Sequence, residues 1–259
     1  MKNYIVLDTE TIGVLRPKIF DMGWVVVDGT THAIIEKRSY GVHSLLKNRD
    51  FMLGDTFVGE TKYKAYLNEI RKKEIISRYN FPFIVKRLAS NIKKYNICYM
   101  YAFNSAFDEN HIASSLEYAE NETHKTFYNP LEDIIVRDIR GYLTPILTSA
   151  EFRKWAETNE KFTDSKNALS ATAETITQYI RNDLDYKEKH LALADALDEK
   201  AILDYCRAHN IDIATQPQKV KIIPNSVKRT LTIKIGEKVQ QYEYTKKTQS
   251  KDGETLTLK

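Results

Sequence analysis

Three apolar stretches rich in valine, isoleucine and tyrosine occupy the first forty residues of the chain: Tyr4–Asp8, Ile19–Asp28 and Ala33–Tyr40. Short apolar runs of this composition, bounded by polar residues, are typical of β-strands. Asp28-Gly29 separates the second stretch from the third and is a turn signal. We therefore predict three strands that pair as an antiparallel meander.

Between residues 62 and 95 the apolar positions recur every three or four residues, which is the spacing of amphipathic helices. Phe81-Pro82 is expected to divide this region into two helices, because proline disfavours helical backbone at the residue before it. Ile97–Ala102 is short and apolar and follows the second of these helices. This order suggests a strand that the chain reaches by a crossover.

The second half of the chain adds helical segments and then a β-rich end. Helices are predicted at residues 109–120, 138–158, 168–182 and 191–208. Strand alternation returns between residues 225 and 258, with a turn at Gly236-Glu237. The pattern as a whole predicts an α/β domain at residues 1–213, built on a mixed sheet flanked by helices, and a small β appendage at residues 214–259.

The predicted appendage is the basic part of the chain. It holds ten lysines and arginines and four acids, a surplus of six positive charges. Because the whole chain carries a net charge of +4, the remaining residues carry −2. A basic segment on a slightly acidic body suggests a polyanionic partner, although a solvated lysine-rich surface is the commoner explanation.

The composition is that of an ordinary globular protein, with 42% hydrophobic and 29% charged residues among 259. No apolar run approaches the roughly 20 residues that span a bilayer. The first residues lack the apolar stretch and cleavage site of a secretory signal. Cys98 and Cys206 are too few for a disulfide framework or a cysteine-rich zinc site. We therefore predict a cytoplasmic protein without membrane contact.

Asp8 and Glu10 lie at the end of the first predicted strand. Residues two apart in a strand project to the same face, so their carboxylates are expected to lie side by side. Two neighbouring anions at the end of an apolar strand repel each other, and a divalent cation between them relieves the repulsion. An Asp-x-Glu pair also occurs by chance in many proteins, so this pair alone is weak evidence for a metal site.

Two further segments carry candidate residues. Asp108 follows the predicted strand Ile97–Ala102 and opens a helix, a position that also suits an ordinary helix N-cap. His190 precedes Asp195 by five residues, which at about 100° per residue places the two about 140° apart on an ideal helix. For both to face one site, His190 must lie in the loop or first turn ahead of the helix. A lone histidine is otherwise usually a surface residue.

In their order and context, these three segments resemble the three sequence motifs of the DEDDh (DnaQ-like) 3′→5′ exonucleases. The resemblance rests on residues 8–13, on the strand–helix context of Asp108 and on the run from His190 to Ala196, and it spans about residues 1–210. It implies a ribonuclease H-like fold with a mixed five-stranded sheet. The long insertion near residues 44–80 is similar to exonuclease-like proteins encoded by bacteriophages, which would place this protein in the cytoplasm of a host cell.

The resemblance also implies hydrolysis of phosphodiester bonds with two metal ions. Asp8, Glu10 and Asp195 are expected to hold the catalytic ion, with Asp8 shared with a second ion that Asp108 helps to position. Hard oxygen ligands of this kind suit Mg²⁺ or Mn²⁺. His190 is expected to accept a proton from the attacking water.

Other positions follow from the resemblance alone. Thr11, Ile12 and Asn104 are expected to contact the terminal nucleotide. A sister subfamily has a tyrosine four residues before the last aspartate, where this chain has Leu191, so the histidine version fits better. Asp21 replaces the glutamate that is usual in the second strand, and we expect this difference to matter little.

The predicted function is therefore a metal-dependent 3′→5′ exonuclease that releases nucleoside 5′-monophosphates from DNA or RNA, preferentially single-stranded. Two alternatives stay open. The first is a non-catalytic module that binds nucleic acid, with the basic appendage contributing affinity. The second is a phosphodiesterase that acts on short oligonucleotides or cyclic nucleotides. Metal-dependent turnover separates the enzyme from the binding module, and analysis of products separates the two enzymes.

Overall fold

The computed structural model describes residues 2–13, 17–54, 59–163 and 168–213, together with the backbone of two strands near the C-terminus. The chain divides into two compact units, Met1–Gln218 and Lys219–Lys259. In the second unit, β7 (Lys228–Ile235) and β8 (Lys238–Thr245) pair antiparallel. The turn predicted at residues 236–237 lies outside the described residues, and the division at residue 213 stays a prediction.

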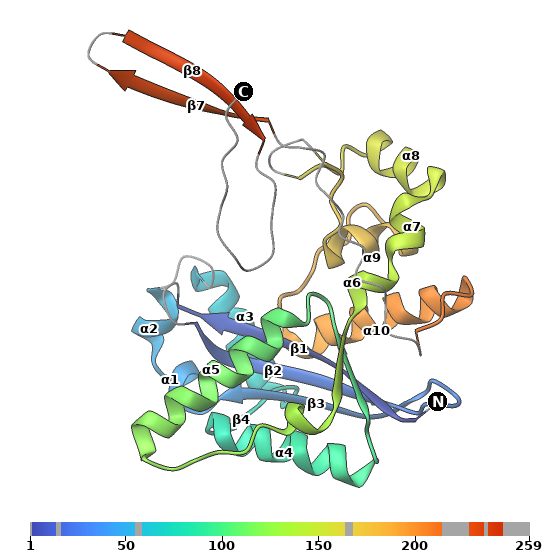
Figure 1. Cartoon of the computed structure of the whole chain (residues 1–259). Coiled ribbons are helices and arrows are strands. Elements are labelled where there is room, and N and C mark those ends of the chain that lie inside the picture. Colours follow the sequence, from blue (N-terminus) through green and yellow to red (C-terminus); the bar gives the residue numbers. More distant parts are fainter. Residues whose placement is uncertain are drawn as a thin grey trace. The chain divides into compact units, whose positions relative to one another are not determined.

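A mixed six-stranded sheet forms the centre of the first unit (Figure 1). Its strands are β1 (Tyr4–Ile12), β2 (Lys18–Val27), β3 (Ile34–Val42), β4 (Ile76–Tyr79), β5 (Tyr99–Ala102) and β6 (Ile135–Asp138). They lie in the order β4-β3-β2-β1-β5-β6. The pairs β1–β2 and β2–β3 are antiparallel, whereas β1–β5, β5–β6 and β3–β4 are parallel. The predicted meander and the mixed sheet are therefore confirmed.

The sheet has six strands where five were expected. The short strands β4 and β6 have four residues each and were not located from the sequence. Both lie at edges of the sheet and most of their residues are partly exposed, so no clear alternation of hydrophobic residues marks them. The region does contain two helices, Gly59–Arg71 and Phe81–Lys94, but residues 72–80 separate them and Pro82 does not. It lies in the first turn of a helix that begins at Phe81, where its fixed φ angle is favourable.

Helices cover both faces of this sheet (Figure 1). Their bounds are α1 (His43–Lys47), α2 (Arg49–Leu53), α3 (Gly59–Arg71), α4 (Phe81–Lys94), α5 (Ala106–Thr123), α6 (Ile139–Tyr142), α7 (Thr144–Thr148), α8 (Ala150–Thr158), α9 (Ala173–Arg181) and α10 (Ala192–Ala208), with a 3₁₀ turn at Pro130–Asp133. None of the described helices is long and apolar enough to cross a membrane.

Alternation along β1 decides which residues face which helices. Ile5 and Leu7 pack in the core cluster that includes residues of α4 and α5. Tyr4 and Val6 pack in the cluster on the opposite face, with α6 and α10. Because successive side chains of a strand alternate between faces, Asp8 continues the second series and projects toward α10.

The segment from α1 to α3 forms a third small core at the end of the β1–β2 hairpin. Ile12 and Phe20 of the hairpin pack there against Met52 and Tyr66, all nearly or fully buried. This segment was predicted as an insertion near residues 44–80. Its packing places α3 beside the acids at the end of β1.

Candidate active site

β1 presents the first two acids. Asp8 pairs with Gly23 and Glu10 with Asp21 in the β1–β2 ladder, and the register shifts immediately after Glu10. Irregularities of this kind re-aim side chains and often occur beside functional sites. Burial, and then the negative charge of Glu199, raise the pKa of Asp8 well above its ordinary range. Asp8 therefore lies among other acids with little to neutralise it.

α5 supplies the third acid. Asp108 lies in the first turn of the helix and is 2% exposed. Thr9 of β1 donates a hydrogen bond from its hydroxyl to Oδ1 of Asp108, at 2.7 Å. Burial raises the pKa of Asp108 to about 7. The N-cap residue is Ser105, so the explanation of Asp108 as an ordinary cap is wrong.

α10 brings the fourth acid against the sheet. A Cβ atom on Gly23 would lie only 2.1 Å from the backbone nitrogen of Leu193, so this close approach of helix and strand requires glycine at position 23. Asp195, in the first turn of α10, is 5% exposed. Burial, and then the charge of Glu188, raise the pKa of Asp195 to about 8. Its Oδ1 atom has no hydrogen-bond partner among the described residues.

His190 lies in the loop before α10, the position that helical geometry requires if it is to face the same site as Asp195. Its backbone has a left-handed φ of 52°, and its side chain is 57% exposed. Nδ1 of His190 lies 3.9 Å from Oε1 of Glu10. Ligand atoms of Glu10, His190 and Asp195 all lie within 4.8 Å of one another. The structure thus brings together residues from β1 and from the start of α10.

Two residues hold this loop in place. The hydroxyl of Tyr66, on α3, donates to the carbonyl oxygen of His190 at 2.7 Å. Oδ2 of Asp21, which is fully buried, accepts from the backbone nitrogen of Ala192 at 3.0 Å. Asp21 therefore has a structural role, because its carboxylate fixes the start of the helix that carries Asp195. The expectation that an aspartate in place of the usual glutamate matters little stays a prediction.

The donor set fits a divalent cation. Several carboxylates are buried together with raised pKa values, and Oδ1 of Asp195 lacks a partner in the described part of the chain. Burying like charges side by side is unfavourable unless a cation compensates them. Carboxylate oxygens with one imidazole suit hard or borderline ions such as Mg²⁺ or Mn²⁺.

Three residues of this region were missed from the sequence. Glu199 lies one turn after Asp195 on the same face of α10, is 3% exposed and accepts from the backbone N–H of Phe103. Burial, and then the charges of Glu174 and Glu10, raise the pKa of Glu188 to about 7. Lys62 of α3 places Nζ 3.0 Å from Oε2 of Glu10. Only Glu199 carried a local signal, as an acid on the buried face of a predicted helix.

The residues expected to contact a nucleotide lie in different surroundings. Ile12 is 2% exposed and packs in the third core, so it offers almost no surface to a ligand. Thr11 is partly exposed. Asn104 is exposed, has a left-handed φ of 63°, and donates its backbone N–H to Oδ1 of Asp138, which also caps α6. Contacts of these residues with a substrate stay predictions.

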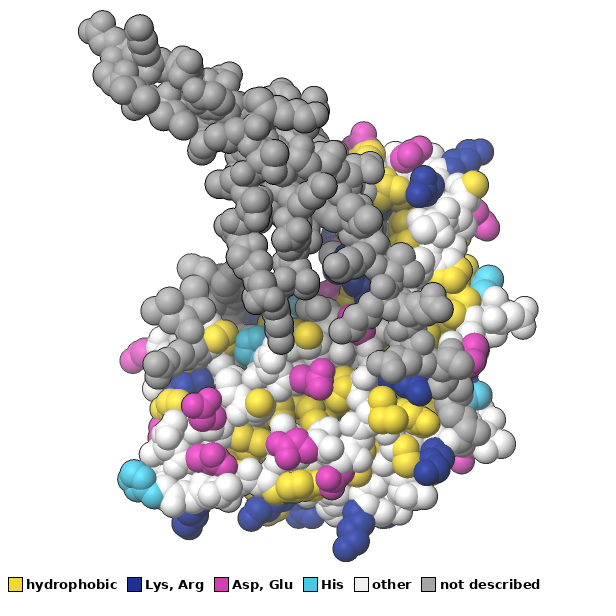
Figure 2. Space-filling view, viewed as in Figure 1, with side chains coloured by type: hydrophobic (Ala, Val, Ile, Leu, Met, Phe, Trp, Pro, Cys, Tyr) yellow, Lys and Arg dark blue, Asp and Glu magenta, His cyan; other side chains and the backbone are white. Residues whose placement is uncertain are grey.

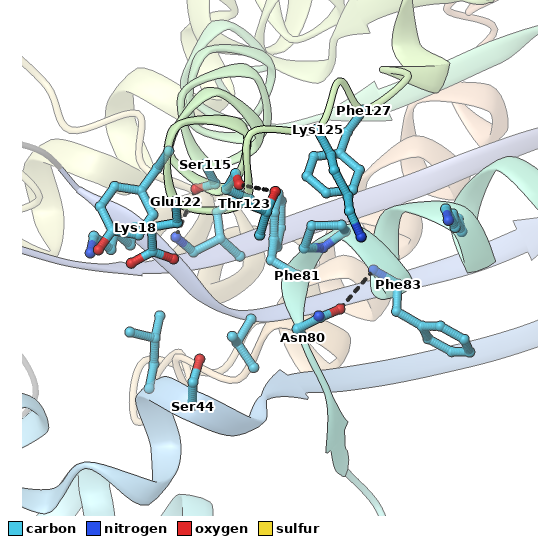
Figure 3. A pocket seen from close by; sticks show the side chains of 17 residues that line it. Lys18, Ser44, Asn80, Phe81, Phe83, Ser115, Glu122, Thr123, Lys125 and Phe127 are labelled. Atoms are coloured by element: carbon cyan, nitrogen blue, oxygen red, sulfur yellow. Dashed lines mark hydrogen bonds between the residues drawn. The ribbon is translucent and has the colours of Figure 1, made fainter.

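Acidic side chains are common on the surface as well. Figure 2 shows them spread over the face that α5 covers. A cavity of about 420 Å³ lies between the C-terminal half of α5 and the start of α4, with Phe81, Ser115 and Lys125 in its wall (Figure 3). None of the candidate acids lines it. Burial and convergence, rather than negative charge alone, therefore distinguish the candidate site.

The chain has a ribonuclease H-like α/β fold. A solved full-length 3′-exonuclease is 12% identical, with 81% of this chain and 62% of that chain covered and a TM-score of 0.52. No protein-family model and no curated protein sequence matches this chain.

Two further solved structures are similar at lower scores. The nuclease domain of 3′hExo, a DEDDh family member bound to rAMP, is 13% identical over 81% of this chain and 94% of that chain, with a TM-score of 0.49. Exonuclease I of E. coli in complex with a dT13 oligonucleotide is 15% identical over 80% of this chain and 41% of that chain, with a TM-score of 0.47. At these identities, similarity concerns the fold alone.

Proposed function

We propose that the chain is a divalent-metal-dependent 3′→5′ exonuclease that releases nucleoside 5′-monophosphates from nucleic acid. The observation that carries this proposal is the convergence of acids from β1 and α10 with His190, beside the buried Asp108 of α5. The fold shared with a 3′-exonuclease supports the same function. Acids on a rigid sheet and two helix starts suit a reaction that depends on positioned cations.

Asp8, Glu10, Asp108 and Asp195 would hold two ions, Mg²⁺ or Mn²⁺. Bound in this way, such ions supply positive charge for the attacking and leaving oxygens of a displacement at phosphorus. His190 would accept the proton of the attacking water, since a largely exposed imidazole beside Glu10 can pass that proton on to solvent.

The substrate is proposed to be a single-stranded 3′ end of DNA or RNA, because a terminal nucleotide must be unpaired to enter a site of this kind. Thr11 and Asn104 would contact that nucleotide, with Ile12 acting mainly through packing. The basic segment at residues 214–259 would add affinity for the strand. A bacteriophage origin and a cytoplasmic location stay predictions from the sequence.

The test is a degradation assay on matched single- and double-stranded DNA and RNA with a label at the 5′ end. With Mg²⁺ or Mn²⁺ we expect stepwise shortening from the 3′ end, release of nucleoside 5′-monophosphates and complete inhibition by EDTA. Asp8→Asn should remove activity, while Glu117→Gln, an exposed acid on α5, should not.

Each other outcome has a defined meaning. Shortening by Asp8→Asn at the wild-type rate would reject the assignment of the site. Binding of the strands without any shortening would favour the non-catalytic module. Cleavage limited to short oligonucleotides or cyclic nucleotides would favour the phosphodiesterase.

A further inference from the structure

Lys62 is a lysine in an unusual place. Its Nζ lies 3.0 Å from Oε2 of Glu10, and the two side chains are only 21% and 15% exposed. Most surface ion pairs are fully solvated and contribute little. This one is largely withdrawn from water and involves a proposed metal ligand, so its position requires an explanation.

The helix that carries Lys62 is fixed against the site. Tyr66, one turn later on α3, is fully buried, its ring packs edge-to-face on Phe20 at 5.0 Å, and its hydroxyl binds the carbonyl of His190. Tyr63 donates its hydroxyl to the carbonyl of Leu46 at 2.9 Å. Residues four apart on a helix share a face, so the packing of Tyr66 also directs Lys62 toward Glu10.

The charges of the site explain what an ammonium group can do there. A site of buried acids repels the phosphates of a nucleic acid unless cations are present. Within the described residues, Lys62 is the lysine or arginine that pairs with one of the four proposed metal ligands. A divalent cation on Glu10 would take over the charge that Lys62 now neutralises. The ammonium group would then lie in a partly buried site, within electrostatic range of Glu188, and the incoming phosphate would be a further anionic partner.

We propose that Lys62 is a substrate-binding residue of this site, which neutralises Glu10 when the cation is absent and contacts a phosphate of the nucleic acid strand when the cation is bound. This inference rests on the proposed exonuclease function. It gives the segment between α1 and α3 a role in recognising the substrate, in addition to packing on the hairpin. The lysine acts by charge and hydrogen bonding and takes no part in proton transfer.

Lys62→Met tests the proposal, with Lys64→Met as the matched control. Lys64 lies on the same helix but is 68% exposed and pairs with Glu60. A labelled single strand is bound in Ca²⁺ under conditions that leave it intact, and affinity is followed by fluorescence anisotropy. We expect Lys62→Met to bind about 10-fold or more weakly, the value of a charge-assisted hydrogen bond. The slope of log affinity against log salt should fall by about 0.7.

A second measurement separates recognition from a merely structural role. Titration of Mn²⁺ in the absence of nucleic acid should show equal or tighter binding to Lys62→Met, because a competing positive charge has been removed from Glu10. Lys62→Arg, which keeps the charge, should retain most of the strand affinity. In the degradation assay KM should rise more than kcat falls.

Several results would overturn the proposal. Equal strand affinity in Lys62→Met and Lys64→Met would reject Lys62 as a phosphate contact while leaving the exonuclease function intact. In the opposite outcome, Lys62→Met binds Mn²⁺ more weakly and melts at a lower temperature. If Lys62→Arg does not restore either property, the residue is structural. Absence of shortening by the wild-type protein would remove the proposed function, and this inference with it.

Discussion

Glu36 and the acids of the candidate site are all buried or nearly buried carboxylates, but they differ in what surrounds them. Glu36 of β3 has a side chain that is 9% exposed, and it pairs with Arg38 at 2.6 Å and with Lys94 at 3.3 Å. Burial alone would raise its pKa, but donors from Tyr95, Asn91 and Lys94 lower it below the ordinary value.

The acids at the end of β1 and at the starts of α5 and α10 show the opposite behaviour. Asp195 and Asp108 have pKa values raised to about 8 and about 7, and burial is the largest cause for each. Asp195 keeps an oxygen without a partner among the described residues, and its neighbours include further acids. A structural acid is surrounded by donors, whereas the acids of the candidate site lack such donors, which supports the proposed cation site.

The largest effect expected from this difference is on activity. Asp195→Asn should lower the rate of strand shortening by at least about 100-fold, the scale on which loss of an electrostatic contact to the transition state acts. The melting temperature of the metal-free variant at pH 8 should equal or exceed that of the wild type, because a repelling charge has been removed. Assay and thermal unfolding are measured on the same preparation. A variant that loses both activity and stability would make Asp195 a structural acid like Glu36.

The next effect concerns pH and metal ions. Asp195 and Asp108 titrate at about 8 and about 7 in the folded state, against the ordinary value of 3.8. At pH values between the ordinary and the raised pKa, the folded state keeps protons that the unfolded state has lost. The contribution of these two acids to the free energy of unfolding therefore falls as pH rises. Carboxylates bind cations in their ionised form, so on the proposed function Mg²⁺ or Mn²⁺ should stabilise the protein more at about pH 8.5 than at about pH 5.5.

Thermal unfolding with and without the ion measures this effect. An ion at about 100 times its Kd contributes roughly 2.7 kcal/mol. In Asp195→Asn the ion should raise the melting temperature less than in the wild type, and this increase should depend less on pH. If the ion raises the melting temperature of the wild type equally at both pH values, the raised pKa values are contradicted.

The smallest effect is expected at Glu36. Glu36→Gln should lower the free energy of unfolding by about 1 to 2 kcal/mol, because Arg38 and Lys94 lose their anionic partner. Urea unfolding measures the loss, and the rate of strand shortening should stay at the wild-type value. If Glu36→Gln leaves stability unchanged and lowers activity, Glu36 is a functional acid and not a structural one.

Local pattern determined much of this arrangement. The period of two along β1 places Asp8 and Glu10 on one face, and the structure shows that this face packs against α10. The angle between His190 and Asp195 on an ideal helix required the histidine to precede α10, where it lies. Such features depend on residues a few positions apart, so backbone geometry alone decides them.

Tertiary structure decided the surroundings of these acids. The pair between Lys62 and Glu10 joins residues 52 positions apart, and the bond from Tyr66 to His190 joins residues 124 positions apart. The edge strands β4 and β6 exist because neighbouring strands offer backbone partners, not because their four residues carry a pattern. Contacts of this kind form only when the packed core brings distant segments together, and no local spacing encodes them.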